Sequence, residues 1–154
     1  MLLTRGHRLK TSVVSRIGAG AMAIAAGVTA IVTGPSAAFA SDVNPYSASA
    51  ICGSGYSVID SAVNEGKYYM YLLYNSSTGK NCAVTLKQAN LGTKTLTDVY
   101  IIPETGTPDE DYGSFAYYAG PVYVDAADEC ITWGGFATVS GTTYSYNSPW
   151  EHCG

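Results

Sequence analysis

Few side chains of this 154-residue chain have the chemistry of a catalytic centre. His152 is the only histidine beyond residue 40, and it stands beside Cys153 at the end of the sequence. A serine hydrolase would need a serine and a carboxylate gathered around that imidazole. The segment Gly53-Ser54-Gly55 lacks the Gly-x-Ser-x-Gly spacing that marks such a nucleophile. We therefore predict that His152 is a surface residue and that the protein is not an enzyme.

Carboxylates offer two further kinds of chemistry. A facing pair could hydrolyse glycosidic bonds, and the candidates in or beside predicted strands are Asp60, Asp98, Asp125 and Glu129. The run Asp109-Glu110-Asp111 could hold Ca²⁺ through hard oxygen ligands. It lacks the spacing of an EF-hand, which ends its twelve-residue loop on glutamate. We predict a solvated acidic loop there, and no metal site and no cofactor in the protein.

The first 40 residues have the pattern of an export signal. A basic segment with Arg5, Arg8 and Lys10 precedes an uncharged run from Ile17 to Thr33, and the segment ends on Ala38-Phe39-Ala40. The alternative is a membrane anchor, but the run is short and rich in glycine and alanine. We predict cleavage after Ala40 and a secreted domain, residues 41–154, that is extracellular and not attached to a membrane.

The mature chain is acidic and has no arginine. Four lysines stand against twelve carboxylates, which gives a net charge of −8 after cleavage. Such a chain repels phosphate backbones and anionic lipid, and it has no bidentate guanidinium to hold a phosphate. We exclude nucleic acid as a partner.

Four cysteines remain after cleavage, at positions 52, 82, 130 and 153. An even count in an oxidising compartment predicts two disulfides, and three pairings are possible. We favour Cys52–Cys82 with Cys130–Cys153, because each pair brackets one contiguous run of predicted strands. Structural zinc is excluded, since no Cys-x-x-Cys pair exists and only one histidine is left.

Short strand-like runs separated by turn residues fill the mature chain. Lys67–Asn75 is apolar and aromatic at both parities, which predicts a central strand covered on both faces. Asn81–Lys87 alternates, with Cys82, Val84 and Leu86 expected on one face. The other predicted strands are Ser57–Ser61, Leu96–Ile102, Ser114–Tyr118, Val122–Ala126, Cys130–Trp133, Phe136–Val139 and Thr142–Tyr146. We predict an all-β fold: a single antiparallel β-sandwich or barrel stapled by two disulfides.

The intervening segments are predicted to be irregular. Ser41–Ala50 is expected to be a flexible arm or a short approach strand, and Pro103–Gly113 a polar loop. Gly134-Gly135 is expected to bend or bulge the chain. The only candidate for a helical turn is Val122–Cys130.

All thirteen tyrosines lie in the mature chain. Tyrosine suits strands, so ordinary sheet packing explains some of them. A domain this small cannot bury them all with their hydroxyls satisfied, and some must reach the surface. Exposed tyrosine gives rigid, amphipathic contact area, which suits binding or assembly.

Several segments, in order, resemble one family of small secreted proteins. They include Cys52-Gly53-Ser54-Gly55-Tyr56, Tyr71-Leu72-Leu73-Tyr74-Asn75, Asn81–Lys87, Gly113–Val122, Cys130–Gly135 and His152-Cys153-Gly154. The chain is similar to the spore-associated protein A family of filamentous actinobacteria across the mature chain and at all four cysteines. The acidic segment Pro103–Tyr112 is longer than the family pattern. The resemblance implies a location at the spore or cell surface and supplies no catalytic residues.

Together these observations predict a non-catalytic secreted protein of the spore or cell surface, adhesive or structural in role. Its expected partners are cell-wall or spore-coat components, contacted through surface tyrosines. The alternative is a secreted protease inhibitor that presents Pro103–Tyr112 as its loop, and a small hydrolase ranks last.

Overall fold

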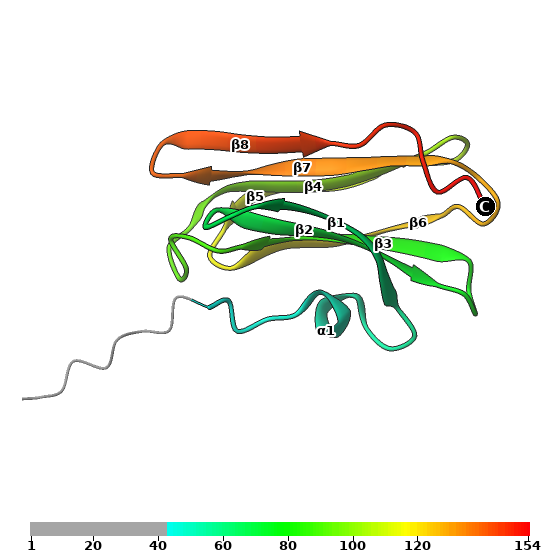
Figure 1. Ribbon diagram of the computed structural model, residues 1–154, viewed down its shortest axis with the longest axis horizontal. Helices are drawn as coiled ribbons and strands as arrows, with labels where there is room; N and C mark the ends of the chain where they lie inside the picture. Colours follow the sequence, from blue (N-terminus) through cyan, green and yellow to red (C-terminus); the bar gives the residue numbers. More distant parts are fainter. Residues whose placement is uncertain (1–42) are drawn as a thin grey trace, which may run out of the picture. The chain divides into compact units, whose positions relative to one another are not determined.

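The computed structural model describes residues 43–154, which form two four-stranded antiparallel sheets packed face to face, with one short helix beneath them (Figure 1). The strand order is β1-β2-β3-β6 in sheet A and β5-β4-β7-β8 in sheet B. The strands are β1 Ser57–Asn64, β2 Tyr68–Asn75, β3 Lys80–Lys87, β4 Thr95–Pro103, β5 Asp109–Phe115, β6 Tyr118–Asp125, β7 Ile131–Val139 and β8 Thr142–Asn147. The all-β prediction is confirmed, in its sandwich form. The predicted signal peptide, residues 1–40, lies outside the described residues.

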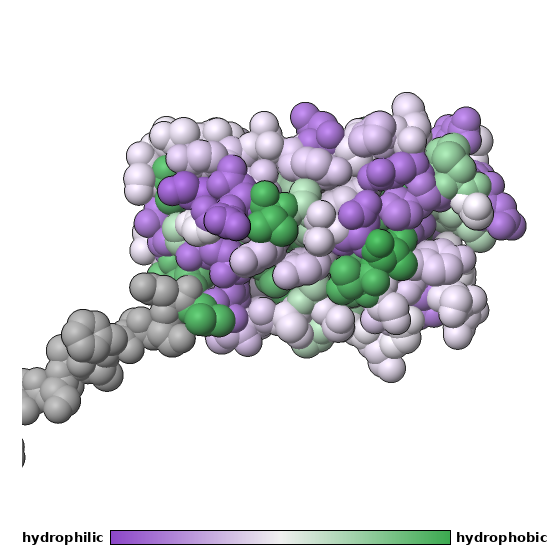
Figure 2. All heavy atoms as spheres, in the orientation of Figure 1, coloured by the Kyte–Doolittle hydropathy of each residue, from purple (hydrophilic) through white to green (hydrophobic). Residues whose placement is uncertain are grey.

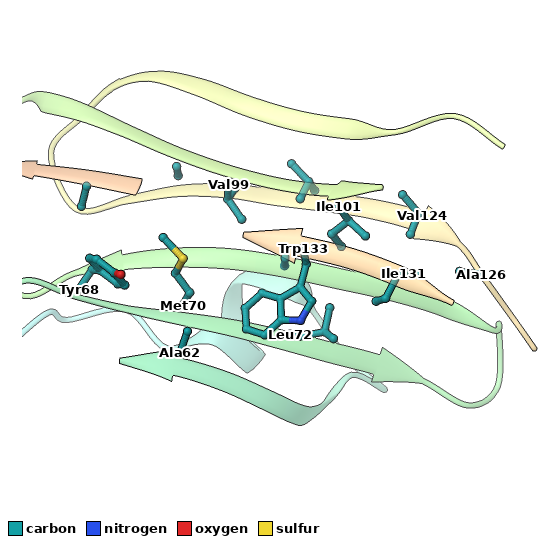
Figure 3. Packing of buried hydrophobic residues seen from close by; sticks show 14 residues of the cluster. Ala62, Tyr68, Met70, Leu72, Val99, Ile101, Val124, Ala126, Ile131 and Trp133 are labelled. Carbon is teal, nitrogen blue, oxygen red and sulfur yellow. The ribbon is translucent and has the colours of Figure 1, made fainter. Parts of the chain in front are cut away.

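The main core fills the space between the sheets. Trp133 of β7 is fully buried, and Figure 3 shows it among Met70, Leu72 and Ile131. The inward residues come from alternate positions of each strand, as the period of a pleated sheet requires. Burying an indole and its aliphatic neighbours supplies most of the driving force for packing the two sheets together.

Sheet A is covered on its outer face as well. Leu73 of β2 and the β3 residues Cys82, Val84 and Leu86 form a second buried cluster with Ala48 and Cys52 of the helix. The predictions that β2 is central and covered on both faces, and that β3 alternates, are confirmed. The first disulfide, Cys52–Cys82, joins the helix to β3, and the second is Cys130–Cys153. Both predicted pairings are therefore present, and no described cysteine is free.

The segment before β1 is partly helical, so the predicted arm or approach strand is wrong. Helix α1, Ala48–Cys52, is five residues long, and the Ser47 hydroxyl caps it by accepting a hydrogen bond from the Ala50 N–H. Small residues let this turn lie close against β3. Within residues 43–154, nothing helical could span a bilayer.

Part of the predicted polar loop Pro103–Gly113 is strand β5, which forms a hairpin with β4. The acidic run predicted a solvated loop, but Asp109 and Asp111 contact the neighbouring sheet. Their carboxylates accept hydrogen bonds from the β6 backbone N–H groups of Tyr123 and Gly120, at 2.8 and 2.7 Å. Acceptors on a strand thus satisfy donors at the edge of the other sheet.

Gly134 and Gly135 do not interrupt β7, which keeps its register with β4 and β8 through both glycines. A Cβ at Gly134 would collide with the Tyr146 carbonyl, and one at Gly135 with the Asp98 carbonyl. The pair is therefore needed for close approach of three strands rather than for a bend. The suggested helical turn Val122–Cys130 is also wrong, because its first half belongs to β6.

Candidate functional site

The tyrosines are distributed over the whole surface of the sandwich. Only Tyr68 is buried, nine others are half-buried, and Tyr46, Tyr112 and Tyr123 are exposed. The prediction that some tyrosines reach the surface is confirmed.

One group of tyrosines lines a groove on the outer face of sheet A. Tyr69 and Tyr71 lie two residues apart on β2, on the face opposite the core, with ring centroids 6.1 Å apart and planes tilted by only 24°. Tyr46 and Val58 also line the groove, whose volume is about 380 Å³. The lining is completed by Val43, Asn44, Ser47, Ala48, Ser49, Leu86 and Gln88. We call this the tyrosine groove.

The chain before α1 is held in place on sheet A by Asn44. Its amide N–H groups donate to the carbonyls of Lys87 and Tyr117, at 2.9 and 2.8 Å, and its carbonyl accepts from the Tyr46 N–H. The Tyr46 ring then packs edge-on against Tyr117 and Tyr118. A single buried asparagine thereby sets one wall of the tyrosine groove, a role that its sequence context did not indicate.

The tyrosine groove carries no charged side chain, although residues 41–154 have twelve carboxylates and only four lysines. Burial raises the pKa of Tyr71, and Tyr69 raises it further, so the phenol remains neutral. Val58 and Val63 of the edge strand β1 are about half exposed beside it. Figure 2 shows hydrophobic residues as separate small patches on the viewed face, some of them over β1. This surface can hold an uncharged ligand by ring contacts and neutral hydrogen bonds.

The four carboxylates considered for glycoside hydrolysis have different partners. Asp125 pairs with Lys80 at 3.0 Å, and Glu129 accepts from the Thr105 hydroxyl. Asp60 lies 3.1 Å from His152 Nε2, so the imidazole does have a carboxylate beside it. Asp98 is buried on the outer side of β4, where the charge of Glu110 acts on it more strongly than that of Asp111. The sequence did not predict that Asp98 and Glu110 would meet, because it placed Glu110 in a loop.

Asp98 is poorly accommodated as an anion. It is 5% exposed, its Oδ1 has no hydrogen-bond partner, and the aromatic pair Tyr112 and Phe136 flanks it on the neighbouring strands. Burial, followed by the charge of Glu110, raises the pKa of Asp98 to about 6. A carboxyl with this pKa changes its protonation between pH 5 and 7.

We expect the Asp98→Asn variant to be more stable than the wild type at pH 8, by about 1–2 kcal/mol. The folded state holds the Asp98 proton more tightly than the unfolded state, so wild-type stability falls as pH rises from about 4 to about 6. The advantage of the amide should therefore nearly vanish at pH 4. Urea unfolding at both pH values measures it, with Asp125→Asn as the exposed control.

A comparison with known proteins gives one clear relative. The chain is 40% identical over 133 residues to spore-associated protein A of Streptomyces coelicolor, which covers 85% of this chain and 84% of that protein. This chain belongs to the spore-associated protein A family. No protein-family model and no solved structure matches it. The resemblance seen in the sequence is thus confirmed as family membership.

Proposed function

We propose that this member of the family is a non-catalytic component of the spore or cell envelope that adheres through its tyrosine groove. The name of the Streptomyces relative supports association with spores. Two disulfides fit a protein that works outside the cell. The observation that carries the proposal is a groove with paired tyrosine rings and no charge, on an otherwise acidic chain.

The proposed occupant is an uncharged polymer of the envelope, a neutral glycan chain. Wall and coat polymers that carry phosphate or carboxylate would be repelled by residues 41–154, whose net charge is −8. A neutral chain meets no such barrier. Its ring faces can lie on Tyr69 and Tyr71, and its hydroxyls can reach neutral groups such as Gln88 and Ser49.

Alanine in place of Tyr71 should lower the affinity for isolated wall or coat material by about tenfold, because a hot-spot aromatic contributes one or two kcal/mol to binding. The matched control is Tyr112→Ala, which removes an exposed tyrosine from sheet B instead. Both variants are measured by pulldown of the mature protein on isolated cell wall and spore coat, in low and in high salt.

Binding through the groove should survive high salt, since screening acts on charges and not on ring contacts. Loss of binding in high salt, or equal binding by Tyr71→Ala and wild type, would contradict binding through the tyrosine groove. Capture of a coat protein alone, with no binding to purified glycan, would contradict the neutral polymer. Fractionation with an antibody tests the location: protein found only in the medium, with none on spores or hyphae, would refute the envelope role.

The structure gives little support to the alternative of a protease inhibitor. It depended on Pro103–Tyr112 as an exposed loop, whereas residues from Asp109 onward are strand β5 with two carboxylates bonded to β6. Titration against subtilisin-like and trypsin-like proteases tests it directly.

A further inference from the structure

Asp60, Glu151 and His152 lie close together at one end of the sandwich, although they are far apart in the sequence. Asp60 lies at a register shift in β1, next to the bulged residue Ile59. Glu151 and His152 lie in the segment after β8. The three residues each offer one ligand atom, and these atoms lie within 4.8 Å of one another. None of the three belongs to the tyrosine groove.

The fold fixes the backbone on both sides of His152. Glu151 forms an isolated β-bridge with Ile131, with both backbone hydrogen bonds at 2.9 Å. The Cys130–Cys153 disulfide fixes the residue that follows His152. The C-terminal segment is therefore attached to the start of β7 on both sides of the imidazole, which limits the conformations that its side chains must lose on binding a ligand.

A buried indole orients the Glu151 carboxylate. Trp133 Nε1–H donates to Glu151 Oε1 at 2.8 Å, which leaves Oε2 for another partner. Outer hydrogen bonds of this kind are the usual means of orienting metal ligands in proteins. The core tryptophan thus does two things: it packs between the sheets and it holds one oxygen of the Glu151 carboxylate.

The cluster has more negative than positive charge. Two carboxylates face a single imidazole, and the one lysine–carboxylate pair among residues 43–154 is used elsewhere, between Lys80 and Asp125. The pKa of nearby Tyr146 is raised by burial and then by Glu151 and Asp60, which reflects this negative field. A divalent cation would neutralise it.

We propose that Asp60, Glu151 and His152 form a binding site for a divalent transition-metal ion of the zinc class. One imidazole nitrogen and two carboxylate oxygens suit zinc, whereas calcium and magnesium prefer oxygen alone. His152 Nε2 and Asp60 Oδ2 are 3.1 Å apart, close to the roughly 3.3 Å between ligands of tetrahedral zinc. Glu151 Oε2, which the indole leaves free, would supply the third ligand.

Three protein ligands leave a fourth position for water or another ligand, as in catalytic and exchangeable zinc sites. His152 also lines a pocket of about 340 Å³, together with Ile59, Tyr74 and Asn81. A ligand of the metal can therefore approach from this pocket.

Isothermal titration of the mature protein with ZnCl₂ tests the site. The affinity tag must be removed and the absence of free thiols checked, because both bind zinc. We expect one ion per chain, at least tenfold weaker binding by His152→Ala, and similar weakening by Asp60→Asn. The control is Asp125→Asn, a carboxylate of the same sheet outside the cluster. Tryptophan fluorescence should also change on binding, because Trp133 contacts Glu151.

Circular dichroism of each variant confirms that it is folded. Zinc binding of equal strength by wild type, folded His152→Ala and folded Asp60→Asn would overturn the site, as would the absence of zinc binding by the wild type. The zinc measurements are independent of glycan binding by the Tyr71→Ala variant. The metal site and the tyrosine groove can therefore be refuted separately.

Discussion

Methionine in place of Lys87 should lower the free energy of unfolding by about 2–4 kcal/mol. Lys87 is the last residue of β3 and is fully buried. Its ammonium donates to the carbonyls of Asn90, Thr93 and Phe115, at 3.3, 2.7 and 3.0 Å. Methionine keeps the length of the stem but offers no donor, so all three acceptors lose the ammonium, and Asn90 keeps only the Thr93 N–H.

Burial already lowers the pKa of Lys87, which shows that the ammonium is desolvated. The expected loss therefore comes from the three carbonyls that lose this donor and from the loop between β3 and β4, two of whose carbonyls bond to the ammonium. Urea unfolding gives the free energy, and amide hydrogen exchange of residues 88–94 should rise. Lys80→Met, at the other end of β3, is the matched control, because its exposed ion pair contributes less than about 1 kcal/mol. An equal loss in both variants would show that the three hydrogen bonds contribute little.

Lys87 also shows where sequence reasoning reaches its limit. Alternation predicted only that Lys87 shares a face of β3 with Ala83 and Thr85, and the structure shows that this face is the one toward sheet B. A charged residue at a strand end ordinarily extends into solvent. Only the path of the following loop, and of the chain near Phe115, supplies the acceptors that allow burial. No local pattern contains that information.

The elements that were predicted correctly are those specified by neighbours in sequence. Strands β2 and β3 follow from their own residue patterns, whereas β7 was predicted as two strands separated by the glycine pair. Strand β5 was missed because its acidic residues are satisfied by backbone N–H groups of β6, in the other sheet. The prediction relied on the local acidic composition, whereas in the structure the contacts with β6 accommodate these residues in a strand.

The candidate sites were predictable to different extents. A tyrosine surface follows from composition, since thirteen phenols exceed what the core can hold. Two other features depend on tertiary structure. Asn44 holds the chain before α1 on sheet A, and Asp60 contacts His152, which lies 92 residues away in the sequence. An isolated histidine near the terminus therefore looked inert in the sequence, whereas the structure gives it two carboxylate neighbours.

The two disulfides should have similar effects on stability and different effects on binding. They link residues 30 and 23 positions apart, and the chain-entropy estimate for such loops is about 3–4 kcal/mol each. We expect that loss from the double variants Cys52→Ser/Cys82→Ser and Cys130→Ser/Cys153→Ser alike, measured by urea unfolding. Serine also removes the thiols that would otherwise bind zinc.

The binding consequences follow from what each disulfide holds. Cys52–Cys82 attaches α1 to β3, and the residues at the start of α1 line the tyrosine groove, so its removal should weaken glycan binding and leave zinc binding intact. Cys130–Cys153 fixes the segment that carries Glu151 and His152, so its removal should weaken zinc binding at least tenfold and spare the groove. Measuring both ligands on both variants, below the unfolding transition, distinguishes these effects from general destabilisation. If each double variant lost both activities equally, the tyrosine groove and the metal cluster would be coupled, and neither site could be assigned to its own disulfide.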